Sequence, residues 1–212
     1  MKPEKIFNYK GFKINVFRDE NCDSDQDWLN SDEAFIVYDH RQFDVRVKGF
    51  DPEEIYLHCR EKKQWFYDDH YVFPLYAYIH SGVALSLSRS GYYPFTCPWD
   101  TSMSGFVLIK QVKGWTYRRE KALKVAESLV ENWNDALSGN VWGYTITYNS
   151  VEVIDNEDYK EENDEEIESC WGFYGDNYKE DSYMVSKCKS IIDNVIERNP
   201  EKYSIKQLQL DL

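Results

Sequence analysis

The sequence lacks the long apolar run that a membrane-spanning helix requires. No stretch of the 212 residues reaches the roughly 18 consecutive apolar residues that would cross a bilayer. The first residues, Met1–Ile6, contain no apolar segment of the kind found in a signal peptide. We therefore expect a cytoplasmic protein.

Cysteines are few and scattered, and the common short binding motifs are missing. The five cysteines are odd in number and contain no CxxC pair, which argues against a disulfide framework and a zinc ribbon. GxxxxGK[ST], GxGxxG and the EF-hand spacing do not occur. We expect free thiols, no cofactor and no metal.

Acidic and aromatic residues are abundant instead. Aromatics make up 17% of the chain, too many for a disordered protein, and the net charge is −13. Residues 19–33 and 155–181 together hold 19 of the 38 acids but only 2 of the 25 Lys and Arg. The rest of the chain is slightly basic, so the acidity is confined to two segments.

Alternating and β-branched segments separated by turns predict a single α+β domain over residues 1–212, built on a mainly antiparallel sheet. A strand or hairpin is expected at 5–17, and strands at 34–38, 43–47, 72–79, 83–87, 106–112, 141–154 and 167–174. Residues 88–105 and the acidic segment 155–168 are predicted to be loops. The tail 203–212 either adds an edge strand or packs as an apolar, flexible arm.

Helical periodicity predicts two long amphipathic helices, at about 118–138 and 182–198, and a short one at about 52–62. Asp51 is a suitable cap for the short helix, and Pro52 suits its first position. Gly139 is suited to end the helix at 118–138. We expect these helices to cover one face of the sheet.

One group of reactive side chains comprises His80, Cys97 and Asp100. In a small hydrolase or transferase, Cys97 would be the nucleophile, His80 the base and Asp100 its orienter. In the structural interpretation, His80 closes a hairpin turn with Gly82 at positive φ, and Cys97 is a small buried residue. The sequence favours the structural interpretation, and we expect no catalytic residue.

Two further interpretations concern metals and histidines. First-row metals accept mixed ligands such as His80, Cys97, Asp100 and Cys170. No pair of these residues has a recognised ligand spacing, so no metal site is predicted. Asp39-His40 and Asp69-His70 are interpreted as ordinary strand-end residues. Adjacent side chains on a strand point to opposite faces.

The segment Ser169–Gly175 reads Ser-Cys-Trp-Gly-Phe-Tyr-Gly just before a predicted helix. A glycine-rich turn at that place can bind an anion. Its acidic surroundings would repel phosphate, so close packing of strands at the glycines is the favoured interpretation.

The two acidic segments predict an electrostatic contact with a basic protein, such as one with a DNA- or RNA-binding groove. Direct binding of nucleic acid is disfavoured, because no basic stripe compensates the acids. The acids expected to make the contact are Asp19, Glu20, Asp23, Asp25, Asp27, Glu157, Asp158, Glu161, Glu162, Asp164, Glu165 and Glu166. A solvated loop without a partner is the alternative interpretation of 155–168.

A third functional hypothesis is the binding of a small nucleotide signal. It requires an aromatic-lined pocket with several cationic side chains. The sequence offers Arg46, Arg89, Arg118 and Arg119 for this role.

The chain resembles a family of uncharacterised proteins encoded by bacteriophages, plasmids and integrative elements, mainly of Gram-positive bacteria. The resemblance covers residues 14 to about 175. Its most specific motifs are His-Ser-Gly at His80–Gly82 and the complete match at Ser169–Gly175. Cys97–Thr101 has Thr101 where the family has Ser, and Asn140 stands where the family has Asp.

The resemblance implies an accessory protein of a mobile element, acting in the cytoplasm of the host bacterium. Small proteins of this origin often inhibit host machinery, including restriction and CRISPR systems. We therefore predict a non-enzymatic inhibitor of a nucleic-acid-targeting defence system (anti-CRISPR or anti-restriction), whose acidic segments bind a host protein.

Overall fold

The computed structural model describes residues 2–20, 29–88, 94–97, 99–114, 118–151 and 162–204. Helices and antiparallel strands combine in an α+β fold. The chain divides into two compact units, where the sequence suggested one domain over 1–212. Unit 1 comprises residues 1–22 and 139–212, and unit 2 comprises 23–138. Unit 2 is thus inserted between the two halves of unit 1, which local sequence patterns do not record.

Unit 1 is built on a four-stranded antiparallel sheet in the order β1-β2-β9-β10. Its strands are β1 (Lys5–Tyr9), β2 (Phe12–Arg18), β9 (Val141–Val151) and β10 (Glu162–Tyr174). Strands β1 and β2 are joined by Lys10 and Gly11, both at positive φ. Such a two-residue turn matches the twist of a hairpin. The order leaves β1 and β10 as the two edge strands.

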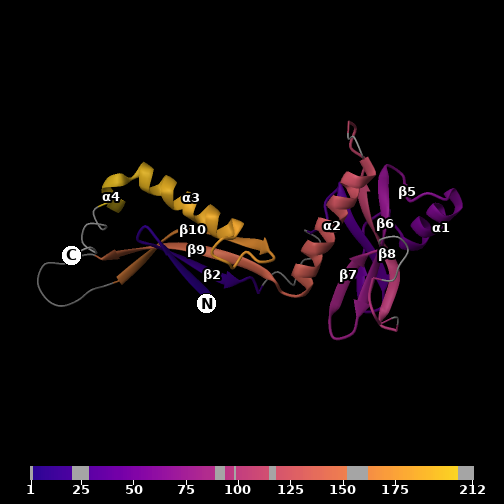
Figure 1. Ribbon diagram of the computed structural model, residues 1–212, viewed down its shortest axis with the longest axis horizontal. Coiled ribbons are helices and arrows are strands. Elements are labelled where there is room, and N and C mark those ends of the chain that lie inside the picture. Colours follow the sequence, from indigo (N-terminus) through magenta and orange to yellow (C-terminus); the bar gives the residue numbers. More distant parts are fainter. Residues whose placement is uncertain are drawn as a thin grey trace, which may run out of the picture. The chain divides into compact units, whose positions relative to one another are not determined.

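One face of this sheet is covered by helix α3 (Tyr183–Arg198) and the short α4 (Pro200–Ser204), as Figure 1 shows. Ser182 caps α3 by accepting from the Val185 N–H. Met184, Cys188 and Ile192 of α3 are fully buried in the core. Tyr203, expected to begin a tail that adds an edge strand or packs as an apolar arm, is helical and packs on Phe12 with ring centroids 5.2 Å apart.

The other face of the unit 1 sheet carries no described helix of that unit. We call it the open face. The strand registers assign the following residues to it: Ile6, Asn8, Lys13, Asn15, Phe17, Gly143, Thr145, Thr147, Asp164, Glu166 and Ser169. Trp171 belongs to the same face, because its ring lies over Gly143. Asn15 Nδ2 donates to the Thr145 and Thr147 hydroxyls at 3.3 and 3.2 Å, which ties the centre of this face together.

Unit 2 has a second antiparallel sheet, in the order β4-β3-β8-β6-β5, with β7 paired to β6. Its strands are β3 (Ala34–His40), β4 (Phe43–Val45), β5 (Phe66–Tyr67), β6 (His70–Ile79), β7 (Val83–Leu87) and β8 (Thr101–Lys110). Pro74 is tolerated inside β6. Its carbonyl accepts from the Ser88 N–H, one residue beyond the end of β7. Pro74 therefore lies where the pairing of β6 with β7 ends, and its missing N–H costs no hydrogen bond inside that pairing.

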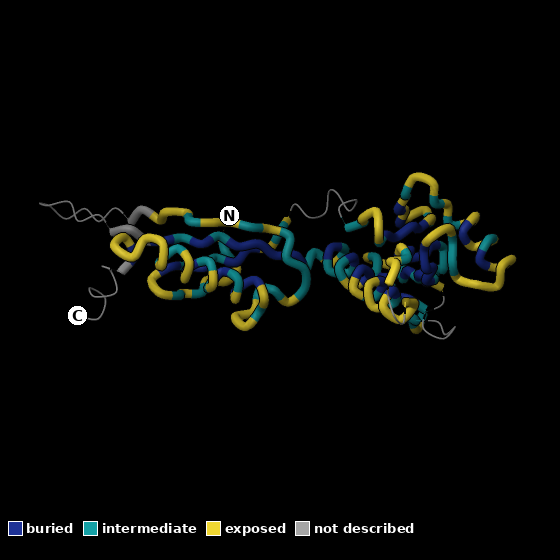
Figure 2. Tube along the Cα trace, turned by 90° about the horizontal axis from the view of Figure 1, so that it is seen from above, coloured by how far each residue is buried: buried dark blue, intermediate teal, exposed yellow. Residues whose placement is uncertain are grey.

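Helices cover both faces of the unit 2 sheet (Figure 1), where the sequence led us to expect one face. Helix α2 (Arg118–Leu137) buries Trp133 and an alanine-rich stripe against one core. Helix α1 (Pro52–Lys62) buries Ile55 and Cys59 against a smaller core on the opposite side. Figure 2 shows the buried stretches following the strands in each unit. Each fully buried large apolar side chain contributes roughly 1.5–3 kcal/mol.

The three helices can be compared with the ranges expected from sequence, 52–62, 118–138 and 182–198. The structure has Pro52–Lys62, Arg118–Leu137 and Tyr183–Arg198. Asp51 is confirmed as the cap of α1, because its Oδ1 accepts from the Glu53 and Glu54 N–H groups. None of the described helices is long and apolar enough to cross a lipid bilayer.

Two segments expected to be loops contain strand instead. Strand β8 begins at Thr101, within the expected loop 88–105, and β10 begins at Glu162, within the expected loop 155–168. Acidic residues have low intrinsic strand propensity. Here the ladder to β9 supplies the pairing, with Asp164 opposite Asn149 and Glu166 opposite Thr147. Tertiary pairing therefore overrides the local pattern.

Candidate functional site

His80, Cys97 and Asp100 do not form the arrangement that a nucleophile and its base require. Cys97 Sγ lies 3.4 Å from Asp100 Oδ2, while the His80 ring stacks at 6.4 Å on Tyr78. No hydrogen bond joins His80 to Cys97 among the described contacts. The His80 backbone N–H donates to the Gly82 carbonyl, and Gly82 is not at positive φ, so that detail of the predicted turn was wrong.

The described residues contain no cluster of metal-ligand side chains that would support the metal hypothesis. Within the described ranges, no group of three or more His, Cys, Asp or Glu side chains is placed to hold an ion. The four described cysteines are free, with Cys59 and Cys188 buried. Burial raises the pKa of the Cys188 thiol to about 12, which keeps it protonated and unreactive. Cys22 lies outside the described residues.

The segment Ser169–Gly175 forms the end of β10 and makes packing contacts. A bulge between Cys170 and Phe173, with Gly172 at φ 83°, lets the Trp171 indole lie directly over Gly143. A Cβ at Gly143 would come within 2.1 Å of that ring. The same indole covers Phe17, with centroids 5.8 Å apart. These contacts support the packing interpretation.

The two acid–histidine pairs differ from each other. His40 is half-buried and accepts from the Gln42 N–H through Nδ1. His70 is 5% exposed, and its Nδ1 lies 2.8 Å from Asp69 Oδ1 without hydrogen-bond geometry. Burial lowers the pKa of His70, and Asp69 opposes this effect. The expectation that Asp69 and His70 point apart was wrong, because Asp69 lies in a turn before β6.

The acidic residues proposed for partner contact fall into described and undescribed groups. Asp19, Glu20, Asp164, Glu165 and Glu166 have described side chains, and Glu162 is described as part of β10. The others lie outside the described residues: Asp23, Asp25, Asp27, Glu157, Asp158 and Glu161. Of the described acids, Glu162, Asp164, Glu165 and Glu166 lie on β10 of unit 1, and Asp19 and Glu20 directly follow β2.

Two acids of β10 point to the helix-covered face and are used inside the unit. Both Glu165 carboxylate oxygens accept from Lys202 Nζ, at 2.8 and 2.7 Å, and this bond raises the pKa of Lys202. Glu168 Oε1 accepts from the buried Tyr144 hydroxyl at 3.0 Å. Burial, and then this hydrogen bond, raise the pKa of Tyr144. These acids stabilise the packing of unit 1.

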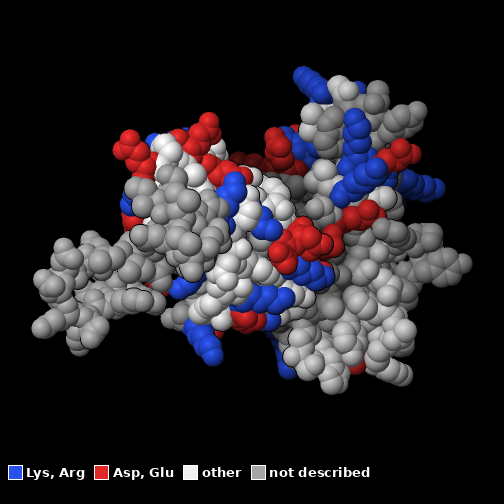
Figure 3. Space-filling model, turned by 60° about the vertical axis from the view of Figure 1, so that its left-hand side comes forward, with Lys and Arg blue, Asp and Glu red and all other residues white. Residues whose placement is uncertain are grey.

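Asp164 and Glu166 point to the open face of the same strand. Asp164 lies 3.6 Å from Lys13 Nζ, with both side chains partly exposed. Glu166 is exposed and forms no ion pair with a described residue. Figure 3 shows acidic and basic side chains interspersed on this side of the molecule. Of the three neighbouring acids, Asp164 and Glu165 each have a lysine partner and Glu166 has none among the described residues.

Large exposed aromatic side chains occur in both units. Trp99 of unit 2 is 93% exposed, and in unit 1 Tyr183 is 72% and Trp171 43% exposed. Aromatic side chains of this kind anchor protein interfaces when a partner buries them. Trp171 is the one that shares the open face with Asp164 and Glu166.

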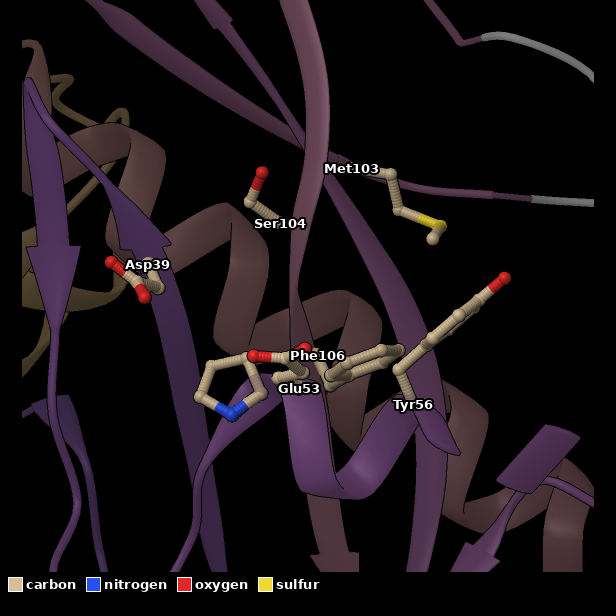
Figure 4. A pocket seen from close by; sticks show the side chains of 7 residues that line it. Asp39, Glu53, Tyr56, Met103, Ser104 and Phe106 are labelled. Atoms are coloured by element: carbon tan, nitrogen blue, oxygen red, sulfur yellow. The ribbon is translucent and has the colours of Figure 1, made fainter. Parts of the chain in front are cut away.

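Unit 2 contains a cavity of about 290 Å³ between the first turn of α1 and strands β3 and β8. Figure 4 shows its lining side chains: Asp39, Pro52, Glu53, Tyr56, Met103, Ser104 and Phe106. Sequence reasoning missed this site. Its residues come from three separate segments, and none of those segments carries a motif.

Arg119 lines a different cavity in unit 2, of about 410 Å³, with Trp65, Phe66 and Tyr71. Its guanidinium donates to the Trp65 and Val72 carbonyls, at 3.1 and 3.3 Å. Burial lowers the pKa of Arg119. Among the other arginines considered for a nucleotide, Arg46 pairs with Asp44 and Asp39, and Arg89 lies outside the described residues.

Searches of family models, curated proteins and solved structures find no match for this chain. The resemblance to the mobile-element family therefore stays a prediction.

Proposed function

We propose that the chain is a non-enzymatic accessory protein of a mobile element that binds a host protein through its acidic open face. The partner would be a protein with a basic nucleic-acid-binding surface. Occupying that surface would inhibit a nucleic-acid-targeting defence system, of CRISPR or restriction type.

This proposal rests on the difference between the acids of β10 that are bonded within unit 1 and those on its open face. Glu165 and Glu168 are held by Lys202 and Tyr144 on the helix-covered face. On the open face Asp164 lies 3.6 Å from Lys13 Nζ, whereas Glu166 forms no ion pair with a described residue. An acid needed only for folding would be expected to have a partner within the unit. An exposed acid and a half-exposed Trp171 on the same face would combine long-range attraction with an aromatic anchor.

The geometry of the alternative enzyme site gives less support. Cys97 contacts a carboxylate rather than an imidazole, so the base that a thiol nucleophile needs is not beside it. The hydrolase alternative with His80, Cys97 and Asp100 therefore needs a rearrangement that the binding proposal does not.

A specific observation favours one second candidate, the binding of a small nucleotide. The cavity at Arg119 is lined by aromatic rings that would stack on a base. It offers one arginine, already bonded to two carbonyls, where a phosphate would call for several cations. Soaking with cyclic nucleotides should raise the melting temperature if this candidate is right.

The test of the main proposal is DNA cleavage by a guide-loaded CRISPR nuclease and by a restriction endonuclease, together with capture of partners from host lysate. The wild-type chain should slow cleavage or retain the nuclease, with an effect that weakens as salt rises. A variant with the acids of 157–166 neutralised should lose both effects. Unchanged capture by that variant would refute the electrostatic part of the proposal.

A further inference from the structure

The cavity beneath the first turn of α1 combines an apolar floor with carboxylates at its rim. Phe106, which is 2% exposed, and Pro52 contribute apolar surface, and Tyr56 and Met103 form one side. In Figure 4, Asp39 lies on the opposite side, with Glu53 between. A ligand entering here would meet aromatic and thioether groups along its length and carboxylates around its polar end.

The charge of the lining is one-sided. None of the seven lining residues is Lys, Arg or His. Among the described residues Asp39 forms an ion pair with Arg46, at 3.5 Å, and Arg46 is shared with the closer Asp44 at 2.7 Å. Glu53 forms no ion pair with any described residue. An anionic ligand would therefore be repelled, and a cation would be attracted.

The size of the cavity restricts the ligand further. Its volume of about 290 Å³ is near the lower end for small-molecule sites, which begin at roughly 300 Å³. A single extended side chain or a small amine would fit, whereas a nucleotide would be both too large and of the wrong charge. Tyr56, 37% exposed, adds apolar ring surface on the side of the cavity where Met103 lies.

We propose that this cavity binds an ammonium or guanidinium group on an aliphatic stem, such as a lysine or arginine side chain. Carboxylates at Asp39 and Glu53 would accept charge-assisted hydrogen bonds from the cation. The stem would pack on Met103 and Phe106. The site lies in unit 2 and does not depend on the acidic open face of unit 1, so either proposal can fail without the other.

The experiment is a titration of the full ¹⁵N-labelled chain, followed by NMR, with butylammonium, agmatine and capped Gly-Lys-Gly and Gly-Arg-Gly peptides. Saturable shifts are expected at the amides of Asp39, Glu53, Tyr56 and Met103. Peptides that bind more tightly than the free amines would identify a partner's side chain as the ligand. The reverse order would identify a small amine. Both results support the cation site.

Single substitutions of the carboxylates test the site, and a matched substitution elsewhere on α1 is the control. Glu53→Gln and, separately, Asp39→Asn should weaken binding at least about tenfold, because each removes a charged acceptor. Glu61→Gln makes the same change on α1 away from the cavity and should leave binding unaltered. Circular dichroism would verify folding of each variant.

Three results would overturn the proposal. The first is the absence of saturable shifts with every cation. The second is equal binding of a peptide whose lysine is Nε-acetylated, since that ligand keeps the stem but loses the charge. The third is equal affinity for Glu53→Gln, Asp39→Asn and Glu61→Gln.

Discussion

The two sheets of this protein differ in how they are covered. The unit 2 sheet lies between α1 and α2, and both faces have a hydrophobic core. The unit 1 sheet has its core only under α3 and α4, and its other face presents Thr, Asn, acidic and aromatic side chains. A face that folding does not need to bury is available for a partner, whereas a doubly covered sheet contributes mainly stability.

The largest expected effect is a loss of stability when alanine replaces a tightly packed glycine of the unit 2 sheet. A matched glycine in the unit 1 sheet gives the comparison. A Cβ on Gly105 in unit 2 would lie 2.2 Å from the Tyr38 ring and 2.4 Å from the Val37 carbonyl. Backbone between two cores cannot move away, so Gly105→Ala should cost roughly 3 kcal/mol or more of unfolding free energy.

Gly143→Ala is the matched change in unit 1. The three atoms nearest to its Cβ would all belong to the Trp171 ring, a side chain on the open face that has more room to move than backbone. We expect a loss of about 1 kcal/mol. Denaturant titration followed by hydrogen exchange in each sheet would measure both variants. Equal costs would contradict the idea that the open face tolerates movement.

A second, smaller effect concerns the free edge of β7 in unit 2. The Asn134 side chain of α2 makes two hydrogen bonds to the Leu85 backbone, at 2.7 and 2.9 Å, as a neighbouring strand would. Asn134→Ala should cost about 2 kcal/mol, since each bond contributes roughly 1 kcal/mol. Asn132→Ala on the same helix is the control, with little change expected in the melting temperature.

A third effect is a change of stability with pH. It should be larger in unit 2, because all four histidines belong to that unit. Burial lowers the pKa of His70 from the ordinary value of 6.5, so the unfolded chain binds the proton more readily. The contribution of neutral His70 is present above about pH 6.5 and is lost as pH falls toward the lowered pKa. Hydrogen-exchange protection factors, which correct for the pH dependence of intrinsic exchange, should fall between pH 7.5 and 5 more in unit 2 than in unit 1. His70→Leu should remove the difference.

Local chemistry predicted those parts of the fold in which neighbouring residues decide the structure. Asp51 and Pro52 begin α1 as expected, and the apolar stripe of α2 indicated its buried face. The start of β10 at Glu162 could not be predicted in this way. Its acidic residues carry no strand signal, and only the ladder to β9 makes them extended.

The candidate sites show the same limit. The acidic segment was visible in the sequence, but the difference between Glu165 and Glu166 was not. It depends on strand register and on Lys202, which lies 37 residues from Glu165 in the chain. The cavity at Asp39, Glu53 and Met103 was invisible for the same reason, since three distant segments meet there.

The most direct test of the central claim compares Glu166→Gln with Glu165→Gln, two neighbouring residues that lose the same charge on opposite faces. The measurement is the dissociation constant, at low and high salt, for the nuclease whose cleavage of DNA the wild-type chain is proposed to slow. We predict that Glu166→Gln weakens binding on the order of fivefold at low salt and less at high salt, while Glu165→Gln binds as the wild type does. Equal affinities of the two variants, or a loss only in Glu165→Gln, would contradict the claim that the open face binds the partner.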